Sequence, residues 1–192
     1  MKATMVLVLC AAIAVPIFAS EPTTALLIVD IQDFYFPGGK VPLVEPEAAA
    51  ANAARVLAAF RAEDKPVVHI RHDFEPGGSI HASVAPIEGE RVFTKTEVSC
   101  FNGTKVLAHL KQIGVERLVI VGMQTHMCLE AATRAAHDLG FECVVVGDAC
   151  ATRDLKYGDR TVPAADVHAS TLATLDGTYA KVVDTETLLG GK

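Results

Sequence analysis

Five short runs rich in valine and isoleucine recur along this chain of 192 residues, and they restrict its possible folds more than any other feature. The runs occupy residues 25–30, 67–70, 117–122, 143–148 and 181–184. Short, almost unbroken apolar runs of this kind are typical of strands that are buried on both faces. Strands buried in this way belong to parallel sheets that helices cover on both sides.

Helical patterns separate the five runs. Apolar residues recur at helical spacing in 46–62, 104–113, 126–139 and 163–176. Because strands and helices alternate, the sequence predicts a three-layer α/β/α fold with a mostly parallel central sheet and Rossmann-like topology. Residues 91–95 are a candidate for a further short strand. We expect the loop 73–90, rich in glycine and proline, to form a lid or rim over one edge of the sheet.

The N-terminus has the composition of a secretory signal peptide. Lys2 precedes an unbroken apolar run, and the small residues Ala19 and Ser20 follow it. The run is shorter than the roughly 20 apolar residues that a membrane span requires. We therefore expect residues 1–19 to be removed and residues 20–192 to form one exported domain, periplasmic or secreted, without a stable membrane span.

Charge and cysteine spacing exclude several partners. The chain has 17 basic and 23 acidic residues, and no lysine and arginine cluster is interleaved with aromatic residues. Nucleic acid is therefore not an expected partner. Beyond the predicted signal peptide the cysteines stand at 100, 128, 143 and 150, which is neither a CxxC pattern nor a metal-ligand spacing. The sequence predicts no metal site and no cofactor.

Reactive side chains stand near the ends of the predicted strands, where ligands bind in open parallel sheets. Asp30 ends the first run, and Lys95 ends the segment 91–95. If Thr125 is the N-cap of the next helix, Cys128 lies in its first turn, where free N–H groups and the positive helix end favour an anion. We therefore expect the pKa of the Cys128 thiol to be lowered and its thiolate to act as a nucleophile.

Each of these residues also has an ordinary structural interpretation. Cys128 is small enough to be a core residue among alanines, Asp30 is suited to cap a turn, and Lys95 is suited to a solvated surface. Together, however, they form a working set: a carboxylate base, a thiol, a lysine that keeps the carboxylate charged, and a helix end for the oxyanion.

Three stretches, TALLIVDIQDFYFPGG, KTEVSCFNGT and GMQTHMCLEAATRAAHDLGFECVVVGDACAT, resemble the isochorismatase-like cysteine hydrolase superfamily. That superfamily includes nicotinamidases, carbamoyl-amide hydrolases and isochorismatases. The resemblance implies a catalytic triad of Asp30, Lys95 and Cys128. It also implies a cis peptide joining Met123 to Gln124 and an oxyanion hole made by the backbone N–H groups of Gln124 and Cys128.

The resemblance further implies a function. It predicts a hydrolase that cleaves a C–N bond, amide or carbamoyl, of a small-molecule substrate through a thioester, and that assembles as a homo-oligomer. The stretch HIRHDFEPGGSIH lacks the Asp-x-His…His spacing of the nicotinamidase metal site, so metal binding is not predicted. The residues expected to contact substrate are Gln32, Phe34, Phe36, Phe101 and His126, with core packing as the alternative for the three phenylalanines.

Two other functions remain open. An isochorismatase-type hydrolase would cleave a vinyl ether with Asp30 as the acid and without the thiol. A secreted binding protein would keep the pocket but catalyse no reaction. Cys100 occupies the position of a family serine, and a reversible disulfide with Cys128 is a further alternative in an oxidising compartment.

Overall fold

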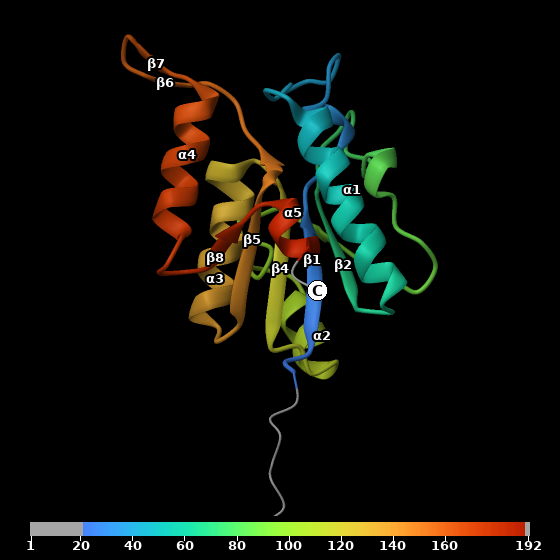
Figure 1. The fold of residues 1–192 in the computed structure, drawn as a ribbon. Helices are drawn as coiled ribbons and strands as arrows, with labels where there is room; N and C mark the ends of the chain where they lie inside the picture. Colours follow the sequence, from blue (N-terminus) through green and yellow to red (C-terminus); the bar gives the residue numbers. More distant parts are fainter. Residues whose placement is uncertain (1–20, 191–192) are drawn as a thin grey trace, which may run out of the picture.

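The central sheet is parallel throughout, as predicted. The computed structural model describes residues 21–190, and the predicted signal peptide, 1–19, lies outside the described residues. The sheet contains β1 (Thr24–Val29), β2 (Val67–His72), β3 (Arg91–Lys95), β4 (Arg117–Met123), β5 (Glu142–Ala151) and β8 (Lys181–Val183). Its spatial order is β3-β2-β1-β4-β5-β8, and every neighbouring pair is parallel (Figure 1). The carboxyl ends of all six strands therefore meet at one edge.

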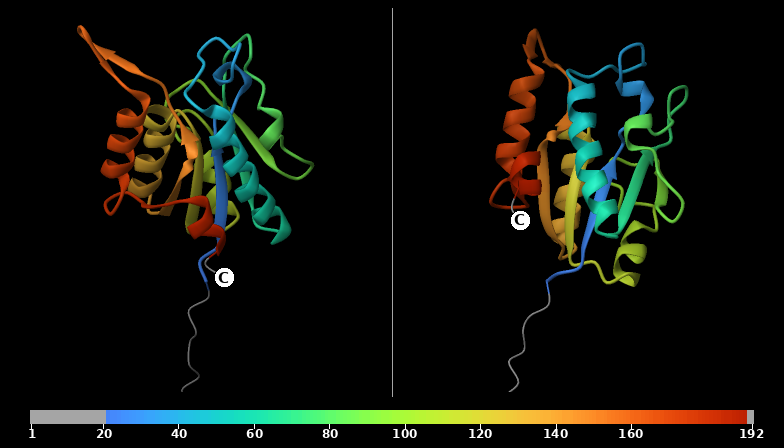
Figure 2. Two further views of the ribbon diagram at one scale, coloured as in Figure 1. Left: turned by 45° about the horizontal axis from the view of Figure 1, so that its top comes forward. Right: turned by 45° about the vertical axis from the view of Figure 1, so that its right-hand side comes forward.

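Helices cover both faces of the sheet, which confirms the three-layer α/β/α fold (Figure 2). One face is covered by α1 (Pro46–Ala62) and α5 (Thr185–Gly190). The other is covered by α2 (Val106–Gln112), α3 (Glu130–Asp138) and α4 (Ala164–Leu175). Among the described residues no helix combines the length and the apolar character that crossing a bilayer requires.

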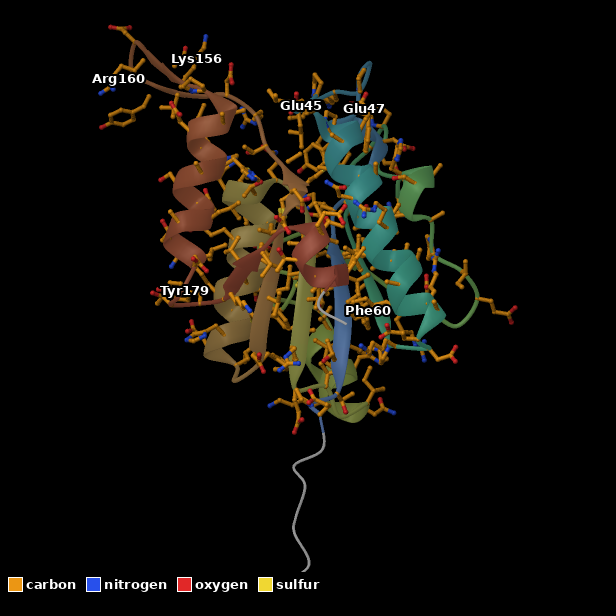
Figure 3. The ribbon with its side chains drawn as sticks, in the orientation of Figure 1. Glu45, Glu47, Phe60, Lys156, Arg160 and Tyr179 are labelled. Atoms are coloured by element: carbon orange, nitrogen blue, oxygen red, sulfur yellow. The ribbon has the colours of Figure 1, made fainter. Side chains whose placement is uncertain are left out.

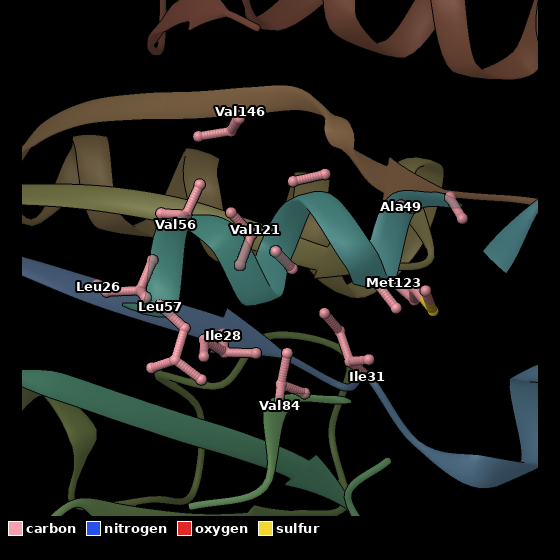
Figure 4. Close-up of a cluster of buried hydrophobic side chains, with 14 of the residues drawn as sticks. Leu26, Ile28, Ile31, Ala49, Val56, Leu57, Val84, Val121, Met123 and Val146 are labelled. Carbon is pink, nitrogen blue, oxygen red and sulfur yellow. The ribbon is translucent and has the colours of Figure 1, made fainter. Parts of the chain in front are cut away.

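The apolar core consists of two clusters, one on each face of the sheet. Successive side chains of a strand point to opposite faces, so Leu26 and Ile28 of β1 pack against α1, whereas Leu27 packs on the opposite side. Leu57 of α1 lies among the first set and is almost fully buried (Figure 4). A Leu57→Ala change would remove a side chain of this kind at a cost of about 2–5 kcal/mol.

The structure adds one pair of strands that the sequence did not predict. The strands β6 (Leu155–Tyr157) and β7 (Arg160–Val162) form an antiparallel hairpin that projects from the carboxyl edge of the sheet, with Lys156 and Arg160 extending from it (Figure 3). Most of its residues are exposed, Tyr157 to 84%. Such short strands, polar on both faces, produce no hydrophobic periodicity, so they cannot be predicted from the pattern of apolar residues.

The loop 73–90 packs against the segment that follows β1. The backbone N–H groups of Asp33 and Phe34 donate to Ser79 and Gly77, and that of His81 donates to Ile31. Within the loop, a short 3-10 helix, η2 (Ala82–Val84), supplies the buried Val84. The loop is therefore held beside the carboxyl end of β1, where Asp30 lies.

Candidate active site

Three strand ends bring Asp30, Lys95 and Cys128 together at the carboxyl edge of the sheet. Asp30 follows β1 directly, Lys95 is the last residue of β3, and Cys128 lies in the turn after β4. Lys95 Nζ is 2.7 Å from Asp30 Oδ2 and 3.2 Å from Cys128 Sγ. All three residues are buried, and the exposed fraction of Cys128 is 6%. The side chains that the sequence singled out are thus in mutual contact.

A close approach between two strands fixes where this cluster forms. Gly122, near the end of β4, has a φ of 139°, and a Cβ there would collide with the backbone oxygen of Val29. Glycine is required at such a position because it has no Cβ and tolerates a positive φ. The next residue on β1, Asp30, itself has a left-handed φ of 50°. The contact thus sets the end of β4, which leads to Cys128, directly against the end of β1.

The Asp30 carboxylate is buried with few partners. Although Oδ2 forms the ion pair with Lys95, neither carboxylate oxygen accepts a hydrogen bond of regular geometry from the described residues. Burial raises the pKa of Asp30, while the charge of Lys95 opposes the increase. Burial lowers the pKa of Lys95, but the charges of Asp30 and Cys128 outweigh it and leave that pKa raised. The lysine is therefore an ammonium, and the carboxylate is a stronger base than an exposed aspartate.

The expectation of a lowered thiol pKa at Cys128 is wrong. Burial, followed by the negative charge of Asp30, raises the pKa of Cys128 to about 12, although Lys95 opposes both effects. The helix end favours an anion, but the fold also buries the thiol and places a carboxylate beside it, and these two effects are larger. At rest Cys128 is therefore a thiol, and a neighbouring base must remove its proton before it can attack.

The turn that carries Cys128 also differs from the expected helix start. Residues Thr125–Leu129 form a π-helical turn, η3, in which the Leu129 N–H donates to Gln124 O, five residues earlier, at 3.3 Å. The N-cap is Gln124 rather than Thr125, whose hydroxyl instead lies 2.9 Å from His168 Nδ1 on α4. Single π turns inside helices are rare and occur frequently at functional sites.

Gln124 lies between this turn and two side chains that the sequence did not suggest. The Met123–Gln124 peptide is cis in the structure. The Gln124 amide donates from Nε2 to the Tyr35 hydroxyl at 3.4 Å and accepts at Oε1 from Arg153 Nε at 3.1 Å. The positive charge of Arg153 therefore lies close to the cluster.

The sequence did not indicate Arg153, and it favoured a surface or rim position for His72, with metal binding together with His81 as the alternative. The predicted strands end at residues 148 and 70, whereas β5 continues to Ala151 and β2 continues to His72. The observed ends place both residues at or just after a strand terminus. His72 Nδ1 lies 3.1 Å from Lys95 Nζ, so it belongs to the cluster.

Asp148, which the sequence placed at a strand end, is part of the structural framework. The pairing of β4 with β5 shifts between Ile120 and Gly122, so Asp148 lies inside an irregular part of β5. Its carboxylate accepts hydrogen bonds from the backbone N–H and the hydroxyl of Thr185, each at 2.8 Å, at the start of α5. Asp148 therefore fixes α5 to the sheet and lies outside the cluster.

The structure separates the five residues expected to contact substrate. Phe34 and Phe36 are buried in the cluster beneath α1, and Phe36 stacks on His81 with ring centroids 3.7 Å apart. Phe101 packs on the opposite face, toward Phe141 at 6.2 Å. The three aromatic rings therefore do not form one wall.

The two polar members of that set also have defined partners. His126 belongs to the same turn as Cys128, and its Nδ1 lies 2.6 Å from the hydroxyl of Thr152. Both N–H groups of the Gln32 amide donate to backbone oxygens, of His72 and of Gly78. These donors of Gln32 are therefore not available to a substrate.

The remaining cysteines and histidines form no second reactive cluster in the part of the chain that the structure describes. Cys100, Cys128, Cys143 and Cys150 are free thiols. Burial raises the pKa of Cys100 to about 12. Among residues 21–190 no group of three or more histidine, cysteine, aspartate or glutamate side chains is arranged to hold a metal ion.

Comparison with known proteins identifies relatives over almost the whole described chain. Residues 24–187 match the model of the isochorismatase domain. An isochorismatase family protein of Bacillus subtilis, YddQ, is 45% identical over 178 residues, which cover 87% of this chain and 99% of that relative. The maleamate amidohydrolase of Pseudomonas putida is 30% identical, over 86% of this chain and 84% of the enzyme.

Solved structures support the same assignment. The crystal structure of an isochorismatase from Pseudomonas putida superimposes with a TM-score of 0.82 at 33% identity, covering 86% of this chain and 89% of that one. The three-layer α/β/α fold, with a buried acid, ammonium and thiol at its carboxyl edge, and these relatives define the class of protein, a hydrolase. More specifically, the chain belongs to the isochorismatase family.

Proposed function

We propose that the chain is a cysteine-dependent amidohydrolase, which cleaves a C–N bond of a small molecule through a thioester. One observation carries this proposal: the buried ammonium of Lys95 contacts both the Asp30 carboxylate, at 2.7 Å, and the Cys128 thiol, at 3.2 Å. A nucleophile, a base and a fixed positive charge are thus assembled in one cluster. The similarity to a maleamate amidohydrolase supports an amide as substrate.

In the first half of the reaction, Asp30 takes the proton of the Cys128 thiol. The sulfur attacks the substrate carbonyl, and the resulting oxyanion accepts hydrogen bonds from the backbone N–H groups of Gln124 and Cys128. The C–N bond then breaks, the leaving nitrogen takes the proton from Asp30, and a thioester remains on Cys128. The raised pKa of Asp30 suits it to accept this proton and to return it.

In the second half, Asp30 removes a proton from water. The hydroxide attacks the thioester, the carboxylic acid departs, and the sulfur regains a proton from Asp30. Lys95 remains an ammonium throughout and opposes the charge that moves between the oxygen and the sulfur. Because its side chain is fully buried, this charge acts with little screening from water.

The test is ammonia release from a panel of small primary amides and carbamoyl compounds by the wild-type protein and by Cys128→Ala. We expect activity in the wild type and its complete loss in the variant. Cys143→Ala is the matched control, because Cys143 is also a buried free thiol but lies on β5. Within residues 21–190 its sulfur has two hydrogen-bond partners, the backbone oxygens of Thr133 and Phe141. Full activity in Cys128→Ala would overturn the thioester mechanism, and no activity in any protein would favour the ether-cleaving alternative or a binding role.

A further inference from the structure

The Lys95 ammonium has a third partner besides Asp30 and Cys128. His72 Nδ1 lies 3.1 Å from Lys95 Nζ. A protonated lysine has three N–H donors and no acceptor, so Nδ1 must be the acceptor in this pair. The imidazole is then neutral and carries its proton on Nε2. The ammonium therefore has three partners, as many as it has N–H groups: the carboxylate of Asp30 in an ion pair at 2.7 Å, the sulfur of Cys128 at 3.2 Å and the imidazole nitrogen of His72 at 3.1 Å.

The fold holds His72 in place through Gln32. The Gln32 side chain is fully buried, its Oε1 accepts from the backbone N–H of His72 at 2.7 Å, and its Nε2 donates to the backbone oxygen of His72 at 2.9 Å. The second N–H of Nε2 donates to Gly78 O at 2.7 Å. Gln32 lies two residues after Asp30. Its side-chain amide therefore connects the segment that carries Asp30 to the end of β2 and to the loop 73–90.

Strand pairing adds a second constraint. His72 and Lys95 are register partners in the β2–β3 pair, and both are the last residues of their strands. Their side chains therefore lie next to each other on the same face of the sheet, at its carboxyl edge. His72 is only partly buried, whereas Lys95 and Asp30 are buried, so the imidazole is the member of this group that solvent reaches.

We propose that His72 is a positioning residue for Lys95: its Nδ1 accepts the third hydrogen bond of the ammonium and thereby fixes Nζ between the Asp30 carboxylate and the Cys128 thiol. The proposal rests on the proposed function, in which Lys95 supports the proton transfer. Without this acceptor the ammonium turns toward water to satisfy its third N–H. Its contacts with the carboxylate and the sulfur then weaken.

The electrostatic surroundings favour the neutral imidazole that this role needs. Burial and the charge of Lys95 lower the pKa of His72, against the opposing effects of the carboxylates of Asp30, Asp73 and Glu97, which face it from the end of β1, its own strand end and the segment after β3. Protonation at acidic pH removes the acceptor and places a second positive charge beside Lys95. The positioning effect should therefore be lost as the pH falls.

The test compares His72→Leu, which removes the acceptor, with His72→Asn, which keeps an acceptor oxygen near the position of Nδ1 but does not titrate. The control is His109→Asn, because His109 lies on α2, near Arg91 at the other end of β3. Two assays are used: amide hydrolysis, which gives kcat and KM, and alkylation of Cys128 by iodoacetamide, whose rate is followed by peptide mass mapping.

We expect His72→Leu to lower both kcat and the alkylation rate by about 3- to 10-fold with little change in KM, the size of one lost hydrogen bond. His72→Asn should stay within about 2-fold of the wild type near neutral pH, and the ratio of its alkylation rate to the wild-type rate should rise as the pH falls, because only the wild type loses its acceptor. His109→Asn should match the wild type in both measurements.

Alkylation needs no substrate, so the two proposals fail separately. If no amide is hydrolysed in a Cys128-dependent way, the proposed function fails, while a loss of alkylation rate in His72→Leu still supports the positioning role. The positioning role is overturned if Cys128 of His72→Leu is alkylated at the wild-type rate, or if His72→Asn is alkylated as slowly as His72→Leu. It is also overturned if the ratio of the His72→Asn rate to the wild-type rate does not change as the pH falls. His72→Asn keeps the proposal testable should His72→Leu fold poorly.

Discussion

Two groups of ionisable side chains, one around His69 and one around His72, lie along β2, and their carboxylates are bonded very differently. Around His69, Glu90 Oε1 accepts from Arg61 Nε at 2.8 Å, and Oε2 accepts from Arg61 Nη2 at 2.9 Å and from the Ile87 N–H at 3.0 Å, with His69 Nε2 at 2.8 Å. Around His72, the Asp30 carboxylate has the ion pair with Lys95 and no hydrogen bond of regular geometry in the described chain.

This difference in hydrogen bonding shifts the pKa values of the two carboxyl groups in opposite directions. Burial raises the pKa of Glu90, but the hydrogen bonds from Arg61, the Ile87 N–H and His69 outweigh it and hold that pKa at about 2. For Asp30 burial prevails and the pKa is raised. A fully bonded carboxylate stabilises the fold, whereas a buried and poorly bonded one retains its affinity for a proton. The predictions below test this division of roles.

The largest effect should come from the Asp30 group. Asp30→Asn should lower kcat by about 10²- to 10⁴-fold, because the base is lost. The double variant Asp30→Asn with Lys95→Met should be equally inactive, yet its free energy of unfolding should lie within about 1 kcal/mol of wild type or above it, since removing both buried charges also removes their desolvation cost. Ammonia release and urea unfolding measure the two quantities. A loss of more than about 3 kcal/mol in the double variant would show that this group stabilises the fold.

The opposite result is expected for the Glu90 group. Glu90→Gln should lower the free energy of unfolding by about 2–4 kcal/mol, because Arg61 and His69 lose their anion, and kcat should stay within about 2-fold of wild type. Glu88→Gln is the matched control, because Glu88 is exposed and only two residues away. Unfolding in urea and amide hydrolysis provide the measurements. Equal stability of the two variants would contradict a structural role for Glu90.

The pH dependence of stability should distinguish the same two carboxylates by sign. The pKa of Glu90 falls from 4.5 to about 2 on folding, so its contribution is present above pH 4.5 and is lost as the pH falls from 4.5 toward 2. Asp30 makes no such contribution, because its folded pKa is raised rather than lowered. The stability gap between wild type and Glu90→Gln should therefore shrink between about pH 6 and about pH 3, as measured by urea unfolding. A gap that stays constant over this range would refute the assignment.

The smallest effect is expected at Cys100. Its thiol is fully buried and its pKa is about 12, so it carries no charge that acts on Asp30, Lys95 or Cys128. Cys100→Ser should change kcat by less than about 2-fold. Intact mass measured without reductant should show free thiols at Cys100 and Cys128, as in the structure. A mass lower by two hydrogens, mapped to this pair, would instead establish the disulfide alternative.

The sequence was most informative where hydrophobic patterning and hydrogen bonding coincide. The first helix, 46–62, was predicted with its observed ends, and the candidate strand 91–95 is β3. The pattern of apolar residues was misleading where hydrogen bonding continues without it. The polar end of β2 and the irregular end of β5 extend the sheet beyond their apolar runs, so the positions of His72 and Arg153 at the site were not predicted. Lys95, Asp30 and Cys128 came from strand ends and from resemblance, but the pKa of the thiol depends on burial and on a carboxylate that is distant in the sequence.

The π turn has a consequence for how this sequence is aligned and altered. Since each α-helical residue advances about 100° around the axis, one additional residue in the turn displaces everything before it by about that angle relative to α3. A helical wheel drawn continuously through residues 125–138 therefore misplaces the start of the turn relative to Cys128 and α3. Deleting the exposed Met127 would restore regular spacing and change the direction in which Gln124, the N-cap, is presented relative to Cys128. A one-residue gap in an alignment at this point therefore means a different arrangement of the residues around Cys128, even when Asp30, Lys95 and Cys128 are all retained.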